Sequence, residues 1–487
     1  MLNELKKESN LTTTDNGAVT YVSTESFCLD LFSSIGASRD LEREEVEAMF
    51  QRAYAEDKKL ALKILFFARD LRGGLGEREV FRIIIRWLAH NDKDAVIRNI
   101  KYITEFGRFD DLLCLLSTPV ESEVIAIIST QLKDDLDNMN KGNPVSLLAK
   151  WLPSINASSY QSLHDALIIA KALGLSNAEY RKYLSALRKH IGIIENNLRE
   201  KEYTFDYSKL PSGALFKYRE AFMREDYERY AKFLNSVESG EAKLNASTLM
   251  PYQVVNPIIN LYKDFDSTER QALDATWNSL PNYTNGQNAL VVMDGSGSMY
   301  TSYASVYPIN VAISLAIYFA ERNEGHYKNN FITFSQTPRL VEIKGVDIYE
   351  KVKYCMTFFE VANTNLEKVF NLILRTAIKY NLPQSELPEM IYIISDMEFD
   401  SCVDTDGMTN FQSAKQKFES HGYKLPTVVF WNVYASTKNQ PVTKNEQGVI
   451  LVSGCNPTLF SMVTSGDIDP YKFMLQTLSV ERYSGIE

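Results

Sequence analysis

The stretch ALVVMDGSGS, residues 289–298, decides the fold of the C-terminal part of this chain. Its first five residues are apolar without a break, which is typical of a strand buried on both faces of a parallel sheet. Similar runs follow at 330–334, 390–395, 427–431 and 449–452, and amphipathic stretches lie between them at 308–322, 366–380 and 410–420. This alternation predicts a doubly wound α/β sheet, with ligands bound beyond the carboxyl ends of the strands.

The turn after this first strand is rich in oxygen donors. It has the pattern DxSxS, formed by Asp294, Ser296 and Ser298. Thr364 precedes the second predicted helix and Asp396 ends the third predicted strand, so both are expected at the same edge of the sheet. Hard oxygen ligands suit Mg²⁺ rather than a metal that prefers thiolates. We therefore predict a Mg²⁺ site formed by these five side chains, with an ordinary surface turn as the alternative for the DGSGS motif taken alone.

The order of these elements resembles the metal-ion-dependent adhesion site (MIDAS) of von Willebrand factor A domains. The resemblance implies that Asp294, Ser296 and Ser298 coordinate the metal directly or through water, and that Thr364 and Asp396 complete the shell. It also implies that one bound water is exchanged for an acidic group of a partner. The expected cofactor is therefore Mg²⁺ or another hard divalent cation.

Residues next to these positions leave alternatives open. Asn365 stands where relatives of the von Willebrand factor A type often carry Asp, so its amide either weakens the support of the site or caps the following helix. Glu398 and Asp400 either assist the site or lie in solvent as loop acids.

From about Glu42 to Tyr262 the chain reads as a series of helices. Segments such as AVIRNIKYITEF and AEYRKYLSALRKHIGIIENNL carry apolar residues at three- and four-residue spacing. Glycine and proline clusters separate the segments. We predict an N-terminal segment (1–45), an all-α, HEAT-like helical-repeat domain that could close into a ring (46–280), and the α/β domain (281–487). Because the letters show no strict repeat, a large irregular bundle is the alternative.

A helical array followed by an adhesion-type domain resembles the Ro autoantigen (TROVE-related) family, in which a ring of helical repeats closed by such a domain binds RNA. A nearer likeness lies in the phrases LFFARDLRGG at 65–74, AKWLPS at 149–154 and ISDMEFD at 394–400. These resemble an uncharacterised Ro-related family of phage, plant and bacterial proteins, over most of the chain. That nearer family has no settled activity, so RNA binding is implied only by the more distant one.

Two groups of basic residues give independent support for contact with RNA. The first lies around the glycine turn at 73–76 and comprises Arg69, Arg72, Arg78, Arg82 and Arg86. The last three are spaced by four, which predicts one ridge of guanidinium groups that could bind phosphates bidentately.

The second basic group comprises Arg181, Lys182, Arg188 and Lys189. Tyr180 and Tyr183 are near enough in the sequence to stack a base. The alternative for both groups is an ordinary solvated helix face, because Asp70, Glu77 and Glu79 interleave with the first.

Composition and charge exclude several classes of protein. With 45% hydrophobic and 23% charged residues, the chain is a folded protein. A net charge of -10 argues against a protein that coats nucleic acid without specificity. No apolar run approaches the ~20 residues of a membrane span, and the start lacks a signal-peptide core, so we expect a cytoplasmic protein without a membrane partner. The five cysteines form no CxxC pair and the five histidines no HxxxH pair, which argues against a zinc site.

Other motifs do not support catalysis. The glycines at 73–76 lack the following Lys-Ser/Thr of a P-loop, and we expect Glu77 to open the next helix. Asp110-Asp111 is predicted to be a helix cap, and the acidic residues at 404–406 to form an Asx turn rather than a calcium loop. No GxSxG motif is present, and no nucleophile lies beside a histidine.

We therefore predict a non-enzymatic, Ro-like binding protein without a small-molecule substrate. Its helical part contacts single-stranded or structured RNA, and its metal site binds a protein partner through an exposed carboxylate. The alternative is a protein-only adaptor that uses the metal site without RNA. A Mg²⁺-dependent nuclease is less favoured, because the sequence offers no general base and no second metal cluster.

Overall fold

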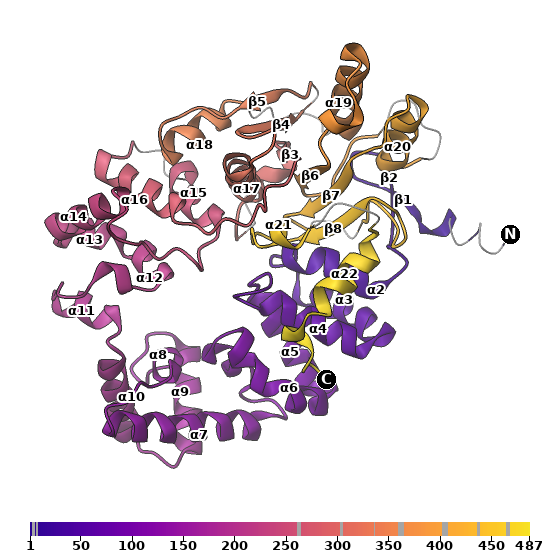
Figure 1. The fold of residues 1–487 in the computed structure, drawn as a ribbon. Helices are drawn as coiled ribbons and strands as arrows, with labels where there is room; N and C mark the ends of the chain where they lie inside the picture. The colour runs from indigo at the N-terminus through magenta and orange to yellow at the C-terminus, as the bar shows by residue number, and fades with distance from the viewer. Residues whose placement is uncertain are drawn as a thin grey trace.

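The structure is a computed structural model of the 487-residue chain. It describes Met1, Leu5 and residues 8–260, 264–301, 305–335, 337–358, 365–401, 408–435, 439–463 and 468–487. A helical part is followed by a part that contains a mixed six-stranded sheet (Figure 1). The predicted order of an all-α part and an α/β part is thus confirmed.

The strand order of the sheet is β5-β4-β3-β6-β7-β8. Its strands are β3 (Ala289–Asp294), β4 (Asn330–Phe334), β5 (Leu340–Glu342), β6 (Met390–Ser395), β7 (Thr427–Asn432) and β8 (Val449–Ser453). All pairs are parallel except β4 with β5, the short edge strand. After β3 the chain adds β4 and β5 on one side of that strand, and then β6, β7 and β8 on the other side. The winding direction therefore switches between β3 and β6. Such a switch point leaves a crevice beyond the carboxyl ends of the two strands, where ligands bind.

Both faces of the sheet are covered, which explains the unbroken apolar run in β3. Val291 and Met293 point into a core that includes α17 (Pro308–Arg322). Leu290 and Val292 point into a second core with α19 (Leu366–Tyr380) and α20 (Asn410–Ser420). A strand with helices on both faces has no solvated side, so alternation of polar and apolar residues disappears.

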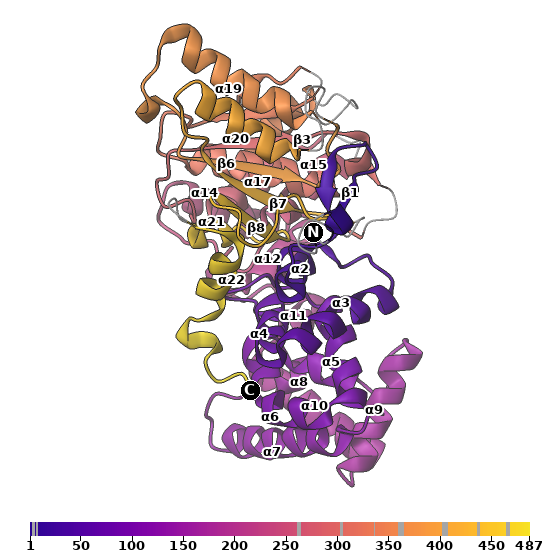
Figure 2. The same ribbon diagram turned by 90° about the vertical axis from the view of Figure 1, so that its right-hand side faces the viewer.

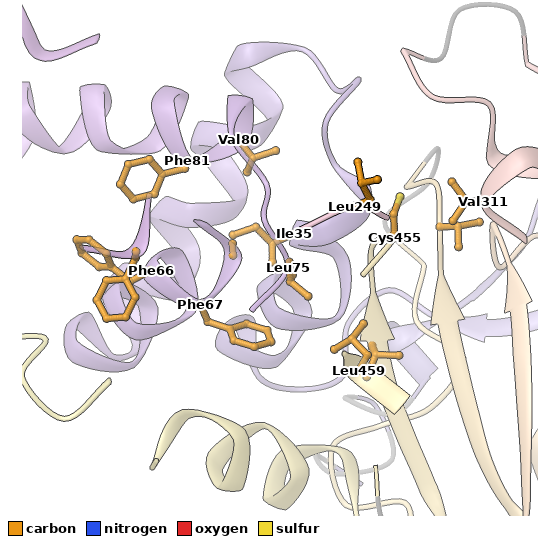
Figure 3. Packing of buried hydrophobic residues seen from close by; sticks show 14 of the residues in the cluster. Ile35, Phe66, Phe67, Leu75, Val80, Phe81, Leu249, Val311, Cys455 and Leu459 are labelled. Carbon is orange, nitrogen blue, oxygen red and sulfur yellow. The ribbon is translucent and has the colours of Figure 1, made fainter. Parts of the chain in front are cut away.

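Helix α17 joins the two parts of the molecule. Every residue from Pro308 to Ala320 is buried. One side of the helix packs on β3, β4 and β6, and another on α15 (Pro251–Asn260) and α18 (Ile348–Met356). A helix that is buried all round belongs to the interior of a single core. Figure 3 follows this core from Phe66 and Phe81 in the helical part to Cys455 and Leu459 beside the sheet.

The helical part consists of the following elements: α2 (Phe27–Ser34), η1 (Ile35–Ala37), α3 (Arg43–Glu56), α4 (Lys58–Arg69), α5 (Glu79–Asn91), α6 (Lys93–Phe106), η2 (Phe109–Leu115), α7 (Glu121–Asn140), α8 (Leu148–Trp151), α9 (Tyr160–Ala172), α10 (Asn177–Ile191), α11 (Ile194–Glu200), η3 (Tyr207–Lys209), α12 (Ser212–Lys217), α13 (Arg219–Glu225), α14 (Tyr227–Glu238), α15 and α16 (Ser267–Asn278). Local sequence sets many of their ends. Helix α10, for example, begins at a capping box of Ser176 and Glu179 and ends at Gly192 with φ 66°.

These helices trace an arc whose two ends both rest on the α/β part (Figure 1). At one end, α2 and η1 pack against the edge strand β8. At the other end, α15 packs on α17, and α15 and α16 pack on α18. The chain therefore closes on itself through the α/β part. No helix in the described residues is both long and apolar enough to cross a bilayer.

Both terminal segments cross between the two parts. An N-terminal hairpin, β1 (Leu11–Thr13) with β2 (Val19–Tyr21), lies against loops of the α/β part. The C-terminal segment passes through α22 (Pro470–Leu478) and η6 (Glu481–Tyr483) and ends beside α6 (Figure 2). The linear division into 1–45, 46–280 and 281–487 thus describes the order of elements along the chain, whereas packing in space mixes the segments.

The C-terminal segment is anchored on the buried carboxylate of Asp70. Arg482 pairs with both carboxylate oxygens, and the Tyr483 hydroxyl donates to Oδ2 at 2.9 Å. Burial alone would raise the pKa of Asp70, but these donors and the Arg72 amide outweigh it, and the pKa is lowered. The resulting stability is present above the ordinary Asp pKa and is lost as the pH falls through the lowered value.

Replacing Arg482 with alanine is expected to lower the free energy of unfolding by about 1.5–3 kcal/mol, because a buried carboxylate loses its charged donor. Denaturant unfolding at neutral pH measures this loss. Arg43→Ala is the matched control, since its pair with Glu47 is exposed and contributes at most ~0.5 kcal/mol. Equal losses for the two variants would contradict an anchoring role for Arg482.

Candidate metal centre

Two aspartates stand at the carboxyl ends of the strands that flank the switch point. Asp294 is the last residue of β3, and Asp396 directly follows β6. These strands are parallel neighbours, with Met293 opposite Ile394, so both carboxylates reach the same edge of the sheet. Both residues are buried, with 0% and 1% of their surface exposed.

Hydrogen bonds gather the predicted ligands around these two carboxylates. Asp294 Oδ1 accepts from the Ser296 amide at 2.9 Å, and its Oδ2 accepts from Ser395 Oγ at 2.5 Å. Ser296 Oγ lies 3.0 Å from Ser298 Oγ, and the Ser298 side chain hydrogen-bonds Asp396. Four of the five predicted ligands therefore lie together. The fifth, Thr364, lies outside the described residues.

The two carboxylates of this group perturb each other's pKa. Burial and then the charge of Asp396 raise the pKa of Asp294 to about 7, and burial also raises the pKa of Asp396. Among the described residues no Lys or Arg is a main influence on the pKa of either carboxylate, and Asp396 Oδ2 is buried without a hydrogen-bond partner. Two adjacent buried carboxylates without a counter-charge are unfavourable.

The donor set fits a hard divalent cation. It consists of two carboxylates and two hydroxyl groups, which is the oxygen chemistry that Mg²⁺ prefers. In the described part of the chain, this site included, no group of three or more His, Cys, Asp or Glu side chains is arranged to hold a metal, so the donor set depends on its hydroxyl groups as well as on its two carboxylates. Ser296 is buried whereas Ser298 is exposed, so the approach from solvent is on the Ser298 side.

The structure shows the contacts of Asn365 and Glu398, each of which had two possible roles from the sequence. Asn365 Oδ1 accepts from the Lys368 amide at 2.9 Å, which confirms that Asn365 caps α19. Glu398 is only 4% exposed, and its Oε2 accepts from the Asp15 amide at 2.9 Å. The alternative of a solvated loop acid is therefore wrong for Glu398, because the side chain is buried and bonded to the N-terminal hairpin. Asp400 is half-buried.

Most side chains of the first basic group form ion pairs or hydrogen bonds around η2. Arg69 is only 1% exposed and pairs with Asp111, which corrects the expectation that it presents a charge to RNA. Arg82 also pairs with Asp111, at 2.9 Å, and Arg86 donates to backbone carbonyls of η2 and the residue after it. These side chains bind a buried carboxylate and backbone carbonyls. The spacing of Arg82 and Arg86 is therefore explained by their contacts with η2 and the residue after it.

The exposed members of this group are Arg72 and Arg78. Arg78 pairs with Glu79, and Arg72 Nη1 donates to a backbone carbonyl of α6 at 3.3 Å.

Asp111 accepts from the Arg108 amide, which confirms its capping role. Glu77 does not open the next helix, which begins two residues later; it is buried and pairs with Arg39.

The second basic group divides in the same way. Arg188 donates to the carbonyls of Ala149 and Leu152, so it braces the turn that carries the AKWLPS phrase. Tyr180 is fully buried and donates to the Pro153 carbonyl, which corrects the expectation that it stacks a base. On the surface of α10, by contrast, Arg181, Lys182 and Lys189 are exposed, and Tyr183 is half-buried.

Basic and acidic residues are unevenly distributed along the helical part, which single motifs of the sequence do not reveal. The segment from Lys141 to Arg219, which covers α8 to α12, contains 12 Lys and Arg residues and six Asp and Glu residues. The whole chain contains 52 Lys and Arg and 62 Asp and Glu. This part of the arc is therefore basic in an acidic protein. Summing charges over windows of the sequence would have revealed it.

Comparisons with known proteins give relatives without a described activity. The family model of domain of unknown function DUF2828 matches residues 14–129 and 162–286, and that of domain of unknown function DUF7788 matches residues 288–474. An uncharacterised protein of Acanthamoeba polyphaga mimivirus is 31% identical over 509 aligned residues, which cover 96% of this chain and 87% of that protein. The crystal structure of the Deinococcus radiodurans Ro protein (RSR) aligns with a TM-score of 0.48 and 13% identity, over 90% of this chain and 99% of that one.

Proposed function

We propose that this chain, which belongs to the same family as the uncharacterised mimivirus protein, is a non-enzymatic binding protein. In this proposal a Mg²⁺-dependent site captures an acidic group of a partner. We propose further that its α/β part is a domain of the von Willebrand factor A type. The strand order and the DxSxS turn at the end of β3 support this assignment.

One observation carries the proposal. Asp294 and Asp396 are buried side by side at the switch point, and Asp396 Oδ2 has no partner in the described structure. A purely structural pair of carboxylates would be expected to have a basic neighbour or a full set of donors. A bound divalent cation would neutralise the pair and supply an open coordination position for a carboxylate from solvent.

The chain's own residues then have separate tasks. The sheet holds Asp294 and Asp396 at fixed positions, because both emerge from adjacent hydrogen-bonded strands. Ser395 Oγ and the Ser296 amide orient the Asp294 carboxylate. Ser298 lies on the solvent side, where the partner group approaches. For these side chains we propose binding rather than catalysis.

Calorimetric titration with Mn²⁺ and Mg²⁺ tests this site. We expect one bound ion per chain, and a rise in melting temperature with ion concentration, because a ligand that binds only the folded state stabilises it. For the partner group, acetate and a glutamate-containing peptide should displace water from bound Mn²⁺, measured by water-proton relaxation. If the wild-type protein binds neither Mn²⁺ nor Mg²⁺ at millimolar concentration, the proposed site is refuted.

A second proposed function concerns RNA, and the basic part of the arc favours it. Arg181, Lys182 and Lys189 are exposed on α10 within the segment that has a twofold excess of basic over acidic residues. Arg72 and Arg78 supply exposed guanidinium groups elsewhere in the helical part. We propose that RNA contacts the helical part through these residues, while the metal centre takes a protein partner.

Binding of a labelled single-stranded oligoribonucleotide, followed by fluorescence anisotropy at several salt concentrations, tests this proposal. The variant Arg181→Glu/Lys182→Glu should bind at least tenfold more weakly than wild type and flatten the salt dependence by about 0.7 for each lost phosphate contact. Lys328→Glu/Lys344→Glu, exposed on the α/β part, is the matched control. We expect no cleavage of the RNA in the presence of Mg²⁺. Absence of binding at low salt would favour a protein-only adaptor.

A further inference from the structure

The tip of the N-terminal hairpin lies on the loop that follows the metal-site residue Asp396. Thr14 Oγ1 donates to the Phe399 carbonyl at 2.6 Å, and Asn16 Nδ2 donates to the Glu398 carbonyl at 2.8 Å. The Asp15 amide donates to Glu398 Oε2 at 2.9 Å. Each of these three contacts joins residues more than 380 positions apart in the sequence, so the tip connects the start of the chain with the loop after β6.

The rest of the hairpin tip continues this attachment. Gly17 forms an antiparallel bridge with Asp400. Ala18 is 2% exposed and packs in the core that also holds Met397 and Phe399. The hairpin tip therefore contacts Glu398, Phe399 and Asp400 directly.

This loop has a strained backbone. Met397 has φ 69°, in the left-handed region that residues with a bulky side chain rarely adopt. Its amide is held by Ser395 Oγ at 3.1 Å, the same hydroxyl that donates to Asp294. Such a conformation persists only where the surroundings over-determine it, and it occurs preferentially at ligand sites and switch regions.

A chain of hydrogen bonds therefore connects the metal centre with the hairpin. Asp396 Oδ1 accepts from the Glu398 amide at 3.2 Å, and the Glu398 side chain accepts from Asp15. A metal ligand and the anchor of the hairpin stand two residues apart on one strained segment. A shift of either end of this segment must displace the other.

We infer that the hairpin tip is a positioning element of the metal centre: Thr14, Asp15 and Asn16 hold the 397–400 loop so that Asp396 faces Asp294. This inference rests on the proposed function of the site. Groups that orient a metal ligand from outside change metal affinity by ~10–100-fold when they are removed. Because linkage is reciprocal, bound metal must in turn stabilise the docked hairpin.

The test uses the full chain and the variant Thr14→Val/Asn16→Ala, which removes two side-chain donors and no metal ligand. Its dissociation constant for Mn²⁺ and Mg²⁺ should rise about tenfold over wild type. The matched control is Thr104→Val/Asn91→Ala, whose side chains donate to backbone carbonyls of their own helices. Glu398→Gln, which keeps an acceptor for the Asp15 amide, should retain most of the affinity.

Amide hydrogen exchange supplies a readout that a general loss of stability would not move. Saturating Mg²⁺ should slow exchange at Asp15, Gly17 and Ala18 in wild type, and should leave it unchanged in Asp294→Asn. If wild type binds no divalent cation, the proposed function falls, and this inference with it. If wild type binds the ion but the hairpin variant has the same affinity and exchange does not respond to Mg²⁺, the metal site stands and the inference is overturned.

Discussion

Replacing Asp294 with asparagine is expected to raise the melting temperature of the metal-free protein and to abolish its stabilisation by Mg²⁺. In chelator at pH 8, above its raised pKa of about 7, the Asp294 carboxylate is charged and buried beside Asp396, whose own pKa is raised by burial, so the two acids are unfavourable neighbours. Removing one charge should stabilise the fold by on the order of 1–3 kcal/mol. The same change removes a ligand, so the dissociation constant for Mg²⁺ should rise at least tenfold.

Thermal unfolding with and without Mg²⁺ measures both effects in one experiment. Ser296→Ala separates them, because it removes a hydroxyl donor but keeps both charges. That variant should weaken Mg²⁺ binding without any gain of stability in chelator. A lower melting temperature for Asp294→Asn in chelator would mean that the two carboxylates are not an unbalanced pair, and it would count against a cation site.

Replacing Asp111 with alanine should cause the largest loss of stability, about 3–5 kcal/mol, because it breaks a buried ion pair from one side. Asp111 is fully buried, and Arg69 donates to it through Nε at 2.8 Å and Nη2 at 2.6 Å. Arg82 and the Arg108 amide also use this carboxylate. Without it, the Arg69 guanidinium remains buried with no anion, and η2 loses its cap.

Urea unfolding of Asp111→Ala beside Asp110→Ala checks this expectation. Asp110 is partly exposed and pairs with Arg82 and Arg108 at the edge of the cluster, so its loss should be at least twofold smaller. Similar losses for the two variants would show that the stability of this region does not depend on the buried pair.

The sequence predicted best what depends on local pattern. The runs at 330–334 and 390–395 match β4 and β6, and α17 spans the predicted stretch from Pro308 to Arg322. Burial on both faces leaves a visible signature in such elements. The meeting of Asp294 with Asp396 followed from the same logic, since parallel neighbouring strands end at one edge. The three-residue strand β5 was missed because it is too short to carry a pattern.

The sequence could not predict contacts that depend on distant partners. Arg69 looked like a surface cation because Asp111, its counter-ion, lies 42 positions away. Glu398 looked like a loop acid because the hairpin that covers it is 383 positions away. Periodicity reports which face of an element is apolar, and it carries no information about which polar groups that face will meet.

The complete burial of α17 has a consequence for how this polypeptide can be dissected. A cut in the linker near residue 281 would give a C-terminal fragment whose α17 loses α15, and the sheet would also lose the cover of α2 at β8. Such a fragment would expose a large apolar surface and would tend to aggregate. Although two family models meet near this point, one hydrophobic core crosses it, so we expect neither half to fold as an independent unit.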